Sequence, residues 1–336
     1  MTDQIEDFGQ TNKGEDIHRI TLSDETLTVK ILTLGAILQD VRLAGVPHSL
    51  TLGGDDPKGY ATTMAHYGAI VGPVANRISG ASTRIGGVTY SFEANEAGTT
   101  TVHGGLSGTQ RQVWTLVDHS QRSAKLQLDL DDGHGGFPGN RRFVATFEIS
   151  GPGQLTLTLD ATTDQETPIN LANHSYWNLD GAKDTLGQTL TVAADEYLPT
   201  DTTSLPTGEI ASVDGTEFDF RKGRDVGAER EDRLNHTLCL STETTKLRDV
   251  ATLQGKNGVA MTFATTETGL HLYDAAFVSS APFLGFQGAA YDNFAGIALE
   301  AQGWPDAPNK PNFPQINVTP DAPYHQVTRW TFRNER

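Results

Sequence analysis

Hydrophobic and polar residues alternate with a period of two along most of the chain. Leu126, Leu128 and Leu130 share one face of the stretch 125–131, with polar residues between them. The stretch 154–161 repeats this arrangement, with threonines between its leucines. Because successive side chains of a strand point to opposite faces, this alternation predicts β-strands that are buried on one side.

Segments of the same kind continue to the C-terminus. The stretch 26–43 predicts two strands that are interrupted near Gly35. Helical periodicity nowhere exceeds about two turns, so only short helices are expected, around Pro57–Tyr60 and around Val226–Arg230. Other predicted strands are rich in Thr, Val and aromatic residues and cover 143–150, 259–267, 270–278, 296–302 and 325–333.

Many short strands separated by turns predict an all-β fold. The turns are supplied by 35 glycines and 15 prolines, which are spread over the whole chain. No stretch has the composition of a linker, and no internal repeat of the length of a repeat unit is present. We therefore expect residues 1–336 to form a single domain, and a large antiparallel β-sandwich suits this length better than a small barrel.

Composition narrows the class of protein. Hydrophobic residues make up 37% and charged residues 20% of the chain, as in ordinary globular proteins. The formal net charge of -17 disfavours binding to nucleic acid and to anionic membranes. No apolar run has the length of a membrane span, and the first residues lack the pattern of a signal peptide. Cys239 is the only cysteine, which rules out an internal disulfide and favours the cytoplasm.

Two short segments combine polar side chains with glycine in a way that core packing does not require. Asn76 and Arg77 precede a glycine-containing turn, where an arginine could also be a surface salt-bridge partner. His103 is followed by two glycines, which allow the backbone to approach another group closely. The simpler interpretation of His103 is a histidine at the end of a strand.

Two further segments concentrate chemistry-bearing residues. The stretch 168–181 holds His174, Tyr176 and Trp177 among three asparagines, and aromatic faces with amides and imidazoles are what pyranose sugars require. This predicts that these amides and rings contact sugar hydroxyls, although a buried core histidine is an alternative. Glu300 ends an apolar strand, where a carboxylate requires either a partner or a function.

A histidine and a glutamate suit one particular reaction of sugars. A cyclic aldose is a hemiacetal, and its ring opens when a base removes the proton of the C1 hydroxyl and an acid protonates the ring oxygen. Histidine donates protons near neutral pH, and a glutamate beside the anomeric hydroxyl is a suitable base. Closing the ring on the other face reverses both transfers, so no metal or redox cofactor is expected.

Taken together, these segments resemble the aldose 1-epimerase (galactose mutarotase) family. The matching pieces are, in the order of the family, NRISGA, TTVHGG, DGHGGFPGN, TPINLANHSYWNL and ALEAQGWPDAPN. The resemblance covers nearly the whole chain and is most specific in NHSYWNL and in the later segment that contains Glu300. It implies a large β-sandwich (the galactose mutarotase-like supersandwich) that interconverts the α and β anomers of aldoses without a cofactor.

The resemblance also implies a role for each candidate residue. It makes His174 the general acid at the ring oxygen and Glu300 the general base at the C1 hydroxyl. His103 and Arg77 are expected to hold and polarise the sugar. Asn76, Ser175 and Tyr176 are expected to line the pocket.

Two positions depart from the pattern of the family. Asn235 stands before His236, where the family usually has an aspartate that binds sugar hydroxyls, and His271 stands where the family often has a glutamine. Both are candidate substrate-binding residues. We predict that Asn235 shifts the preference away from galactose, toward a sugar that carries a carboxylate or phosphate, a pentose or a deoxy sugar.

Three other functions remain open at this point. His103, His174 and Glu300 could instead form a site for iron or manganese made of two histidines and one carboxylate. The pocket could bind carbohydrate without turnover. A glycosidase requires two carboxylates that flank the scissile bond, and Asp306 is separated from Glu300 by a Trp–Pro pair. The expected partner is a monosaccharide, with no nucleic acid and no membrane, and the protein is expected to be a monomer or a homodimer.

Overall fold

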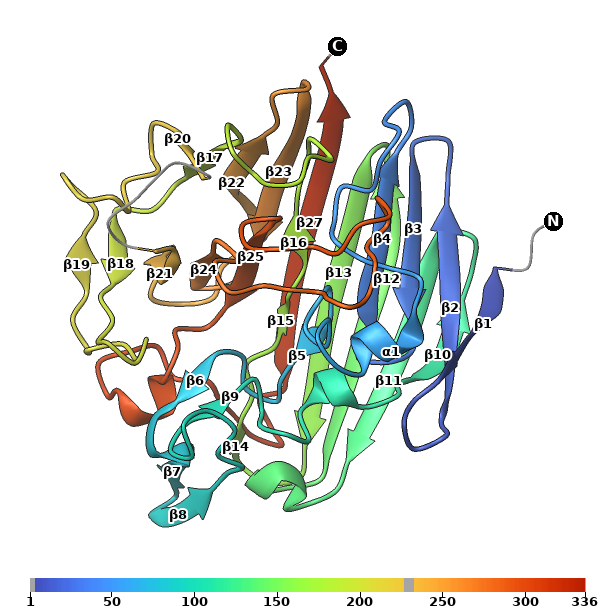
Figure 1. Cartoon of the computed structure of the whole chain (residues 1–336). Coiled ribbons are helices and arrows are strands. Elements are labelled where there is room, and N and C mark those ends of the chain that lie inside the picture. Colours follow the sequence, from blue (N-terminus) through green and yellow to red (C-terminus); the bar gives the residue numbers. More distant parts are fainter. Residues whose placement is uncertain (1–3, 227–232, 336) are drawn as a thin grey trace.

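The computed structural model describes residues 4–226 and 233–335, and antiparallel strands dominate them (Figure 1). The strand pairs of the large sheets run antiparallel throughout, as the alternating pattern predicts. The all-β fold class is therefore confirmed. A short helix is also predicted around Val226–Arg230, but residues 227–230 are outside the described part of the chain, so this prediction is not tested. Whether 1–336 forms a single domain stays a prediction.

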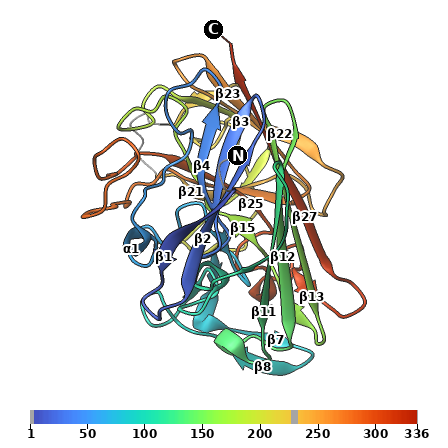
Figure 2. The ribbon, with the colours of Figure 1, turned by 90° about the vertical axis from the view of Figure 1, so that its right-hand side faces the viewer.

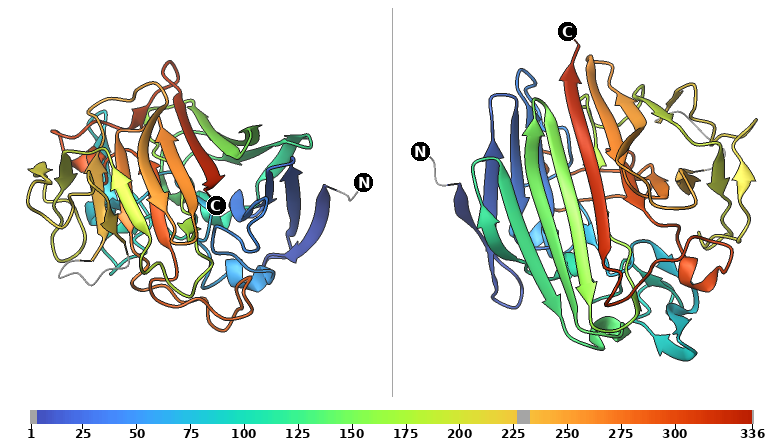
Figure 3. Two further views of the ribbon diagram at one scale, coloured as in Figure 1. Left: turned by 90° about the horizontal axis from the view of Figure 1, so that it is seen from above. Right: turned by 180° about the vertical axis from the view of Figure 1, so that it is seen from behind.

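The largest sheet has nine strands and forms one layer of the molecule. Figure 3 shows it from behind, with β27 in red beside the green β13. Leu126, Leu128 and Leu130 of β11 all point into the core, in agreement with the sequence pattern. The strand order is β10 (Thr115–His119), β11 (Ser123–Leu130), β12 (Arg141–Gly151), β13 (Gln154–Thr163), β27 (Tyr324–Asn334), β23 (Val259–Thr265), β22 (Arg248–Gln254), β17 (Thr189–Val192) and β20 (Arg224–Asp225).

Two smaller sheets form the opposing layer. The first consists of β1 (Ile5–Gln10), β2 (Asp16–Ser23), β3 (Leu27–Leu32) and β4 (Ile37–Leu43). The second has the order β16 (Tyr176–Trp177), β25 (Ile297–Gln302), β24 (Gly269–Tyr273), β21 (Asn235–Cys239), β18 (Glu196–Leu198) and β19 (Ala211–Ser212). Figure 2 shows β3 and β4 facing β12 and β27 across the molecule.

One hydrophobic core joins the two layers. Val29 of β3, Leu157 of β13 and Leu299 of β25 belong to the same buried cluster. Burying apolar side chains of this size stabilises the fold by roughly 1.5–3 kcal/mol each. The two strands predicted for 26–43 are β3 and β4, and Gly35 between them has a φ of 62°, which glycine adopts without strain.

Short elements connect the sheets. The pairs are β5 (Ile70–Val71) with β15 (Ala172–Asn173), β6 (Arg77–Ile78) with β9 (Thr101–Val102), β7 (Ser82–Ile85) with β8 (Val88–Ser91), and β14 (Thr167–Pro168) with β26 (Asn317–Val318). The helix α1 (Pro57–Tyr60) lies where it was predicted, and the side chain of Asp56 caps it by accepting from the N–H of Lys58. The 3₁₀ turns are η1 (Ser79–Ala81), η2 (Thr109–Arg111), η3 (His134–Gly136) and η4 (Ala307–Asn309). In the described part of the chain, no helix is both long and apolar enough to cross a bilayer.

Candidate active site

Alternation along β24 and β25 places polar side chains on the face of the six-stranded sheet that points away from the core. Leu270 and Leu272 belong to the core, so His271 between them points to the opposite face. Glu300 follows the core residue Leu299 in the same way, and it lies opposite His271 in the strand register. A buried carboxyl group and an imidazole thus share one row of the sheet.

The segment that carries His174 is fixed by hydrogen bonds to a neighbouring loop. The backbone N–H of His174 donates to the carbonyl oxygen of Ala69 at 2.9 Å, and the N–H of Gly68 donates to the carbonyl oxygen of His174 at 3.0 Å. The side-chain amide of Asn173 donates to the carbonyl oxygen of Gly68 at 2.8 Å. These bonds fix the backbone from which the imidazole projects toward Glu300.

The asparagines around His174 bond the protein backbone instead of facing the cavity. Asn170 accepts from the N–H of Gly303 at 2.7 Å, which ties this segment to the end of β25. Asn178 donates to the carbonyl oxygen of Ala295 at 2.7 Å. Neither side chain lines the cavity described below. The prediction that these amides contact sugar hydroxyls is therefore wrong, because buried backbone groups require them as partners.

Strand alternation decides which of the four residues from His174 onward reach the cavity. His174 and Tyr176 line it, whereas Ser175 between them is fully buried and lies outside its lining. Trp177 is also fully buried, and its ring centroid lies 5.6 Å from that of another core tryptophan. The structure therefore corrects the expectation that Ser175 lines the pocket and that Trp177 contacts a sugar, since both side chains point to the opposite side.

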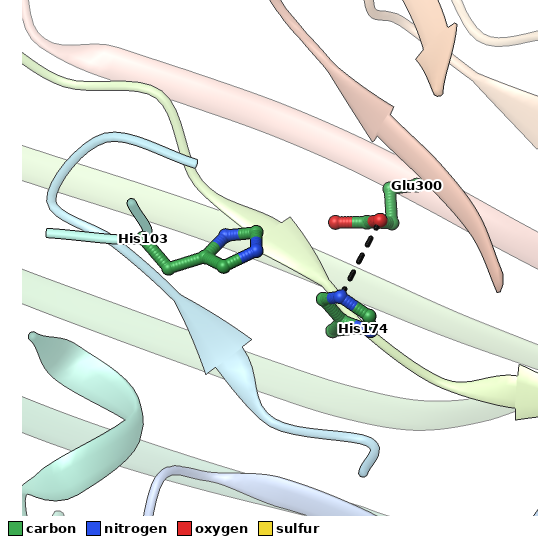
Figure 4. Close-up of side chains that lie close together, drawn as sticks. All are labelled: His103, His174 and Glu300. Carbon is green, nitrogen blue, oxygen red and sulfur yellow. Dashed lines mark ion pairs between the residues drawn. The ribbon is translucent and has the colours of Figure 1, made fainter. Parts of the chain in front are cut away.

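His174 and Glu300 approach each other closely at the centre of the site. Nε2 of His174 lies 3.6 Å from Oε1 of Glu300, and both side chains are almost completely buried (Figure 4). His103 lies on the other side of the same space, and one ligand atom from each of the three residues falls within 4.8 Å of the others. Oε2 of Glu300 and Nδ1 of His174 have no hydrogen-bond partner among the described residues.

Burial shifts the pKa of both central groups toward their neutral forms. It raises the pKa of Glu300 to about 8, and the positive charge of Arg77 opposes this shift only in part. It lowers the pKa of His174 to about 3, and the neighbouring His66 contributes to the lowering. At neutral pH both groups are therefore neutral, and the one titratable proton of the pair is on the carboxyl group.

His103 is oriented by the segment that contains Asn76. The backbone N–H of Asn76 donates to Nδ1 of His103 at 3.1 Å, and the N–H of His103 donates to the carbonyl oxygen of Asn76 at 3.0 Å. The φ values of Asn76 and His103 are 61° and 52°, and Gly104 continues with 76°. A Cβ at Gly104 would overlap the carbonyl oxygen of Gly72. The glycine after His103 therefore permits the close backbone approach that the sequence predicts.

Arg77 is held in place by a carboxylate outside the cavity. Its Nε and Nη2 each donate to one oxygen of Glu96 at 2.7 Å, in the bidentate geometry that fixes a guanidinium plane. The side chain of Arg77 is 15% exposed and lines the cavity. The guanidinium retains further N–H groups for a ligand.

The cavity itself has a volume of about 340 Å³, which is in the range of small-molecule sites. Ser175, Trp177 and the asparagines of 168–181 lie outside its lining, and the other predicted site residues line it, including Asn235 and His271. His66, Tyr67 and Tyr273 also line it, although no sequence pattern pointed to them. Two of these lie just before the strand at Ile70–Val71, in a glycine-containing turn that resembles any other loop in the sequence.

Asn235 and His271 form a hydrogen-bonded unit at one edge of the cavity. Nε2 of His271 lies 3.0 Å from Oδ1 of Asn235, and Nδ1 lies 3.0 Å from the hydroxyl of Thr237. Burial lowers the pKa of His271 well below its usual value, so the ring is neutral. An amide oxygen only accepts, so Nε2 carries the proton and Nδ1 accepts from Thr237. His271 therefore serves as a neutral partner of Asn235 and presents no positive charge to a ligand.

The grouping of His103, His174 and Glu300 raises the question of a metal ion. A neutral imidazole has one lone pair, and burial keeps His103 neutral by lowering its pKa. That lone pair is on Nδ1 and accepts from Asn76, so Nε2 carries a proton and cannot coordinate. The residues present therefore do not fit a site made of two histidines and one carboxylate.

Comparisons with known proteins agree with this architecture. The model of the family described as Aldose 1-epimerase matches residues 18–331. The chain is 32% identical to the galactose mutarotase of Mus musculus over 335 residues, which is 97% of each chain. It is 29% identical to the aldose 1-epimerase of Escherichia coli (strain K12), with 95% of this chain and 96% of the relative covered.

Solved structures show the same fold. A homologue of the GalM/aldose epimerase from C. elegans superposes with a TM-score of 0.87 at 29% identity, covering 95% of this chain and 99% of that one. A galactose 1-epimerase from Lactobacillus acidophilus NCFM gives a TM-score of 0.84 at 26% identity, covering 99% and 98% of the two chains.

Proposed function

The chain belongs to the aldose 1-epimerase family, and on this premise we propose that it interconverts the α and β anomers of an aldose, with Glu300 as general base and His174 as general acid. One observation carries the assignment. The C1 hydroxyl and the ring oxygen of a pyranose are bonded to the same carbon, so their acid and base must lie close together. The separation of 3.6 Å between His174 and Glu300 meets this requirement.

Ring opening moves two protons within the pair. Glu300 takes the proton of the C1 hydroxyl, the C1–ring oxygen bond breaks, and the ring oxygen receives a proton from His174. The open aldehyde then rotates about its C1–C2 bond. Reclosure on the other face of the carbonyl returns one proton from Glu300 to the C1 oxygen and one from the ring hydroxyl to His174.

The protonation state of the central pair suits the open-chain intermediate. After ring opening, Glu300 holds the proton of the C1 hydroxyl and His174 has lost its proton, so both groups are neutral. Burial favours this neutral state of both groups. Before a cyclic sugar can react, this proton must be on the imidazole of His174, so that Glu300 and His174 are both charged. The hydroxyl groups of the sugar stabilise these charged forms by hydrogen bonding. Both states contain equal numbers of protons, so the cycle requires no proton from solvent.

Two residues are suited to stabilise the changing charge. His103 presents Nε2–H as a donor, because its Nδ1 accepts from Asn76. Arg77 supplies a positive charge, and its two hydrogen bonds to the carboxylate of Glu96 keep this charge in position. Hydrogen-bond donors that are held rigidly in a site are the usual means of stabilising a developing oxyanion. We assign both residues to substrate polarisation, with Asn76 as the partner that orients His103.

A glycosidase is disfavoured by the acidic residues of the cavity. Glu300 is the only carboxylate that lines it within the described part of the chain. Asp306 accepts from the N–H and the hydroxyl of Ser79 and does not reach the cavity. A second carboxylate on the other side of the bond, which hydrolysis requires, is therefore missing from the described lining.

Polarimetry tests the proposal directly. Freshly dissolved α-D-glucose and α-D-galactose should reach their equilibrium rotations much faster with the protein than without it. A carbohydrate-binding protein without turnover would leave the rate unchanged, and this result would overturn the proposal. We further propose a monosaccharide substrate, a cytoplasmic location in keeping with the single buried Cys239, and a monomer or homodimer as the working form.

A further inference from the structure

We propose that His66 is a specificity-determining residue that contacts the exocyclic group on C5 of the sugar, and that it selects aldohexoses over the pentoses that lack this group. The inference rests on the proposed function and deepens it, since it names a class of substrate. The sequence around His66 contains no motif.

His66 lies in a segment that is firmly attached to the site. The following residues, Gly68 and Ala69, form the backbone hydrogen bonds that hold His174. The carbonyl oxygen of Gly68 also accepts from the N–H of Leu38 at 2.8 Å, which ties the segment to β4. A side chain on such a segment keeps its position when a ligand enters, as a specificity contact requires.

The ring of His66 faces the cavity beside the other two imidazoles. Its centroid lies 5.7 Å from that of His174 at an interplanar angle of 24°, and 5.2 Å from that of His103. Stacked rings at this distance exchange no hydrogen bond through their nitrogens. Among the residues that the structure describes, none forms a hydrogen bond with a ring nitrogen of His66, and the side chain lines the cavity.

His66 is suited to bind a neutral hydroxyl group. Burial lowers its pKa to about 4, and the charge of Arg111 adds to this effect. The ring is therefore neutral near pH 7, with one nitrogen that donates and one that accepts. A hydroxyl group matches both, because it can donate to one partner and accept from another.

The position of His66 relative to the reacting groups identifies the part of the sugar it meets. Glu300, His174 and His103 lie within 4.8 Å of one another, and His66 is outside this group while its ring contacts both imidazoles. The ring oxygen of a pyranose is bonded to C1 and to C5. When the C1 hydroxyl is at Glu300 and the ring oxygen is at His174, C5 is the neighbour of the ring oxygen on the side away from Glu300. In an aldohexose this carbon bears the hydroxymethyl group.

Pairs of sugars that differ only in this group provide the test. D-xylose is D-glucose without its hydroxymethyl group, and L-arabinose is related in the same way to D-galactose. We expect His66→Phe, which keeps a ring but removes both nitrogens, to lower kcat/KM for each hexose about fivefold to tenfold, as the loss of one hydrogen bond does. For each pentose kcat/KM should change less than about twofold. His119→Phe on the exposed edge strand β10 is the matched control and should leave all four values unchanged.

The substrate provides a second test that does not depend on how well the variant folds. D-galactose and its 6-deoxy form differ by one hydroxyl group, so the wild-type protein should prefer D-galactose, and His66→Phe should abolish this preference. Equal losses for hexoses and pentoses, or a wild-type protein that does not distinguish the 6-deoxy sugar, would overturn the inference. A wild-type protein that accelerates mutarotation of none of these sugars would instead overturn the proposed function.

Discussion

The backbone N–H of Asn76 donates a hydrogen bond of 3.1 Å to Nδ1 of His103. This bond assigns the proton of the neutral imidazole to Nε2, the nitrogen that remains for a ligand. His103 therefore acts as a hydrogen-bond donor toward the cavity and not as a metal ligand. The positive φ values of both residues hold the two segments in the geometry that this bond requires.

From this relationship we predict that the activity does not depend on a metal ion. Exhaustive dialysis against a chelator should leave the mutarotation rate unchanged, because the chemistry consists of proton transfers by side chains. Metal analysis of the dialysed protein provides the control that the chelator was effective. A loss of activity that iron, manganese or zinc restores would contradict the tautomer assigned to His103.

Removal of either member of the central pair should abolish most of the activity. Glu300→Gln retains the size of the side chain without the base, and His174→Asn removes the acid. General acid–base catalysis typically contributes about 10²–10⁴-fold, so each variant should lower the mutarotation rate at least about a hundredfold. Thermal unfolding and circular dichroism should show that both variants retain the fold. Turnover of Glu300→Gln near that of the wild type would exclude Glu300 as the base.

The pH dependence of kcat/KM should follow the single proton that the pair holds. This proton is lost as the pH rises through the pKa of Glu300, about 8, and a second proton is gained only near the pKa of His174, about 3. We expect kcat/KM to be flat from about pH 5 to about pH 7.5. Above about pH 8 it should fall, with a slope that approaches a tenfold decrease per pH unit. Polarimetry with the spontaneous rate subtracted measures this profile. A decline that begins as the pH falls below 7 would contradict the burial effect.

The strands could be predicted because their pattern is local. The leucines of 154–161 alternate within one segment, and β13 contains this segment entirely. His174 and Glu300 could be identified because each stands in a distinctive motif. Their distance of 3.6 Å could not be derived from the sequence, since it results from the pairing of β16 with β25 and of the His174 loop with 68–69.

Other features depend on partners that lie far apart in the chain. Asn170 accepts a hydrogen bond from the backbone N–H of Gly303, 133 residues away. The sequence alone does not show this partner and therefore suggested a sugar contact. His66 was missed for the same reason. Its segment has no motif, and its importance follows only from the two imidazoles that fold next to it.

The identity of residue 235 should control the preferred sugar. Oδ1 of Asn235 accepts from Nε2 of His271, and its amide N–H group reaches the hydroxyl of Ser204 only at 3.4 Å. Asn235 lines the cavity and thus presents an uncharged donor to a ligand. An aspartate at this position would accept from His271 with one oxygen and from sugar hydroxyls with the other, and each charge-assisted bond contributes roughly 1.5–3 kcal/mol.

We therefore expect Asn235→Asp to raise kcat/KM for galactose relative to a sugar that carries its own carboxylate, because the new charge binds hydroxyls and repels an anion. The measurement compares galactose, glucose, a pentose and a uronic acid for the wild type and the variant. Of the sugars predicted to be favoured by an asparagine at position 235, a pentose is the least expected substrate. A pentose has no hydroxymethyl group for His66 to contact. Asn235→Ala separates the effect of the charge from the loss of the amide, and it should weaken binding of all four sugars without changing their order. A wild type that already prefers galactose, together with an unchanged order in Asn235→Asp, would show that residue 235 does not select the sugar.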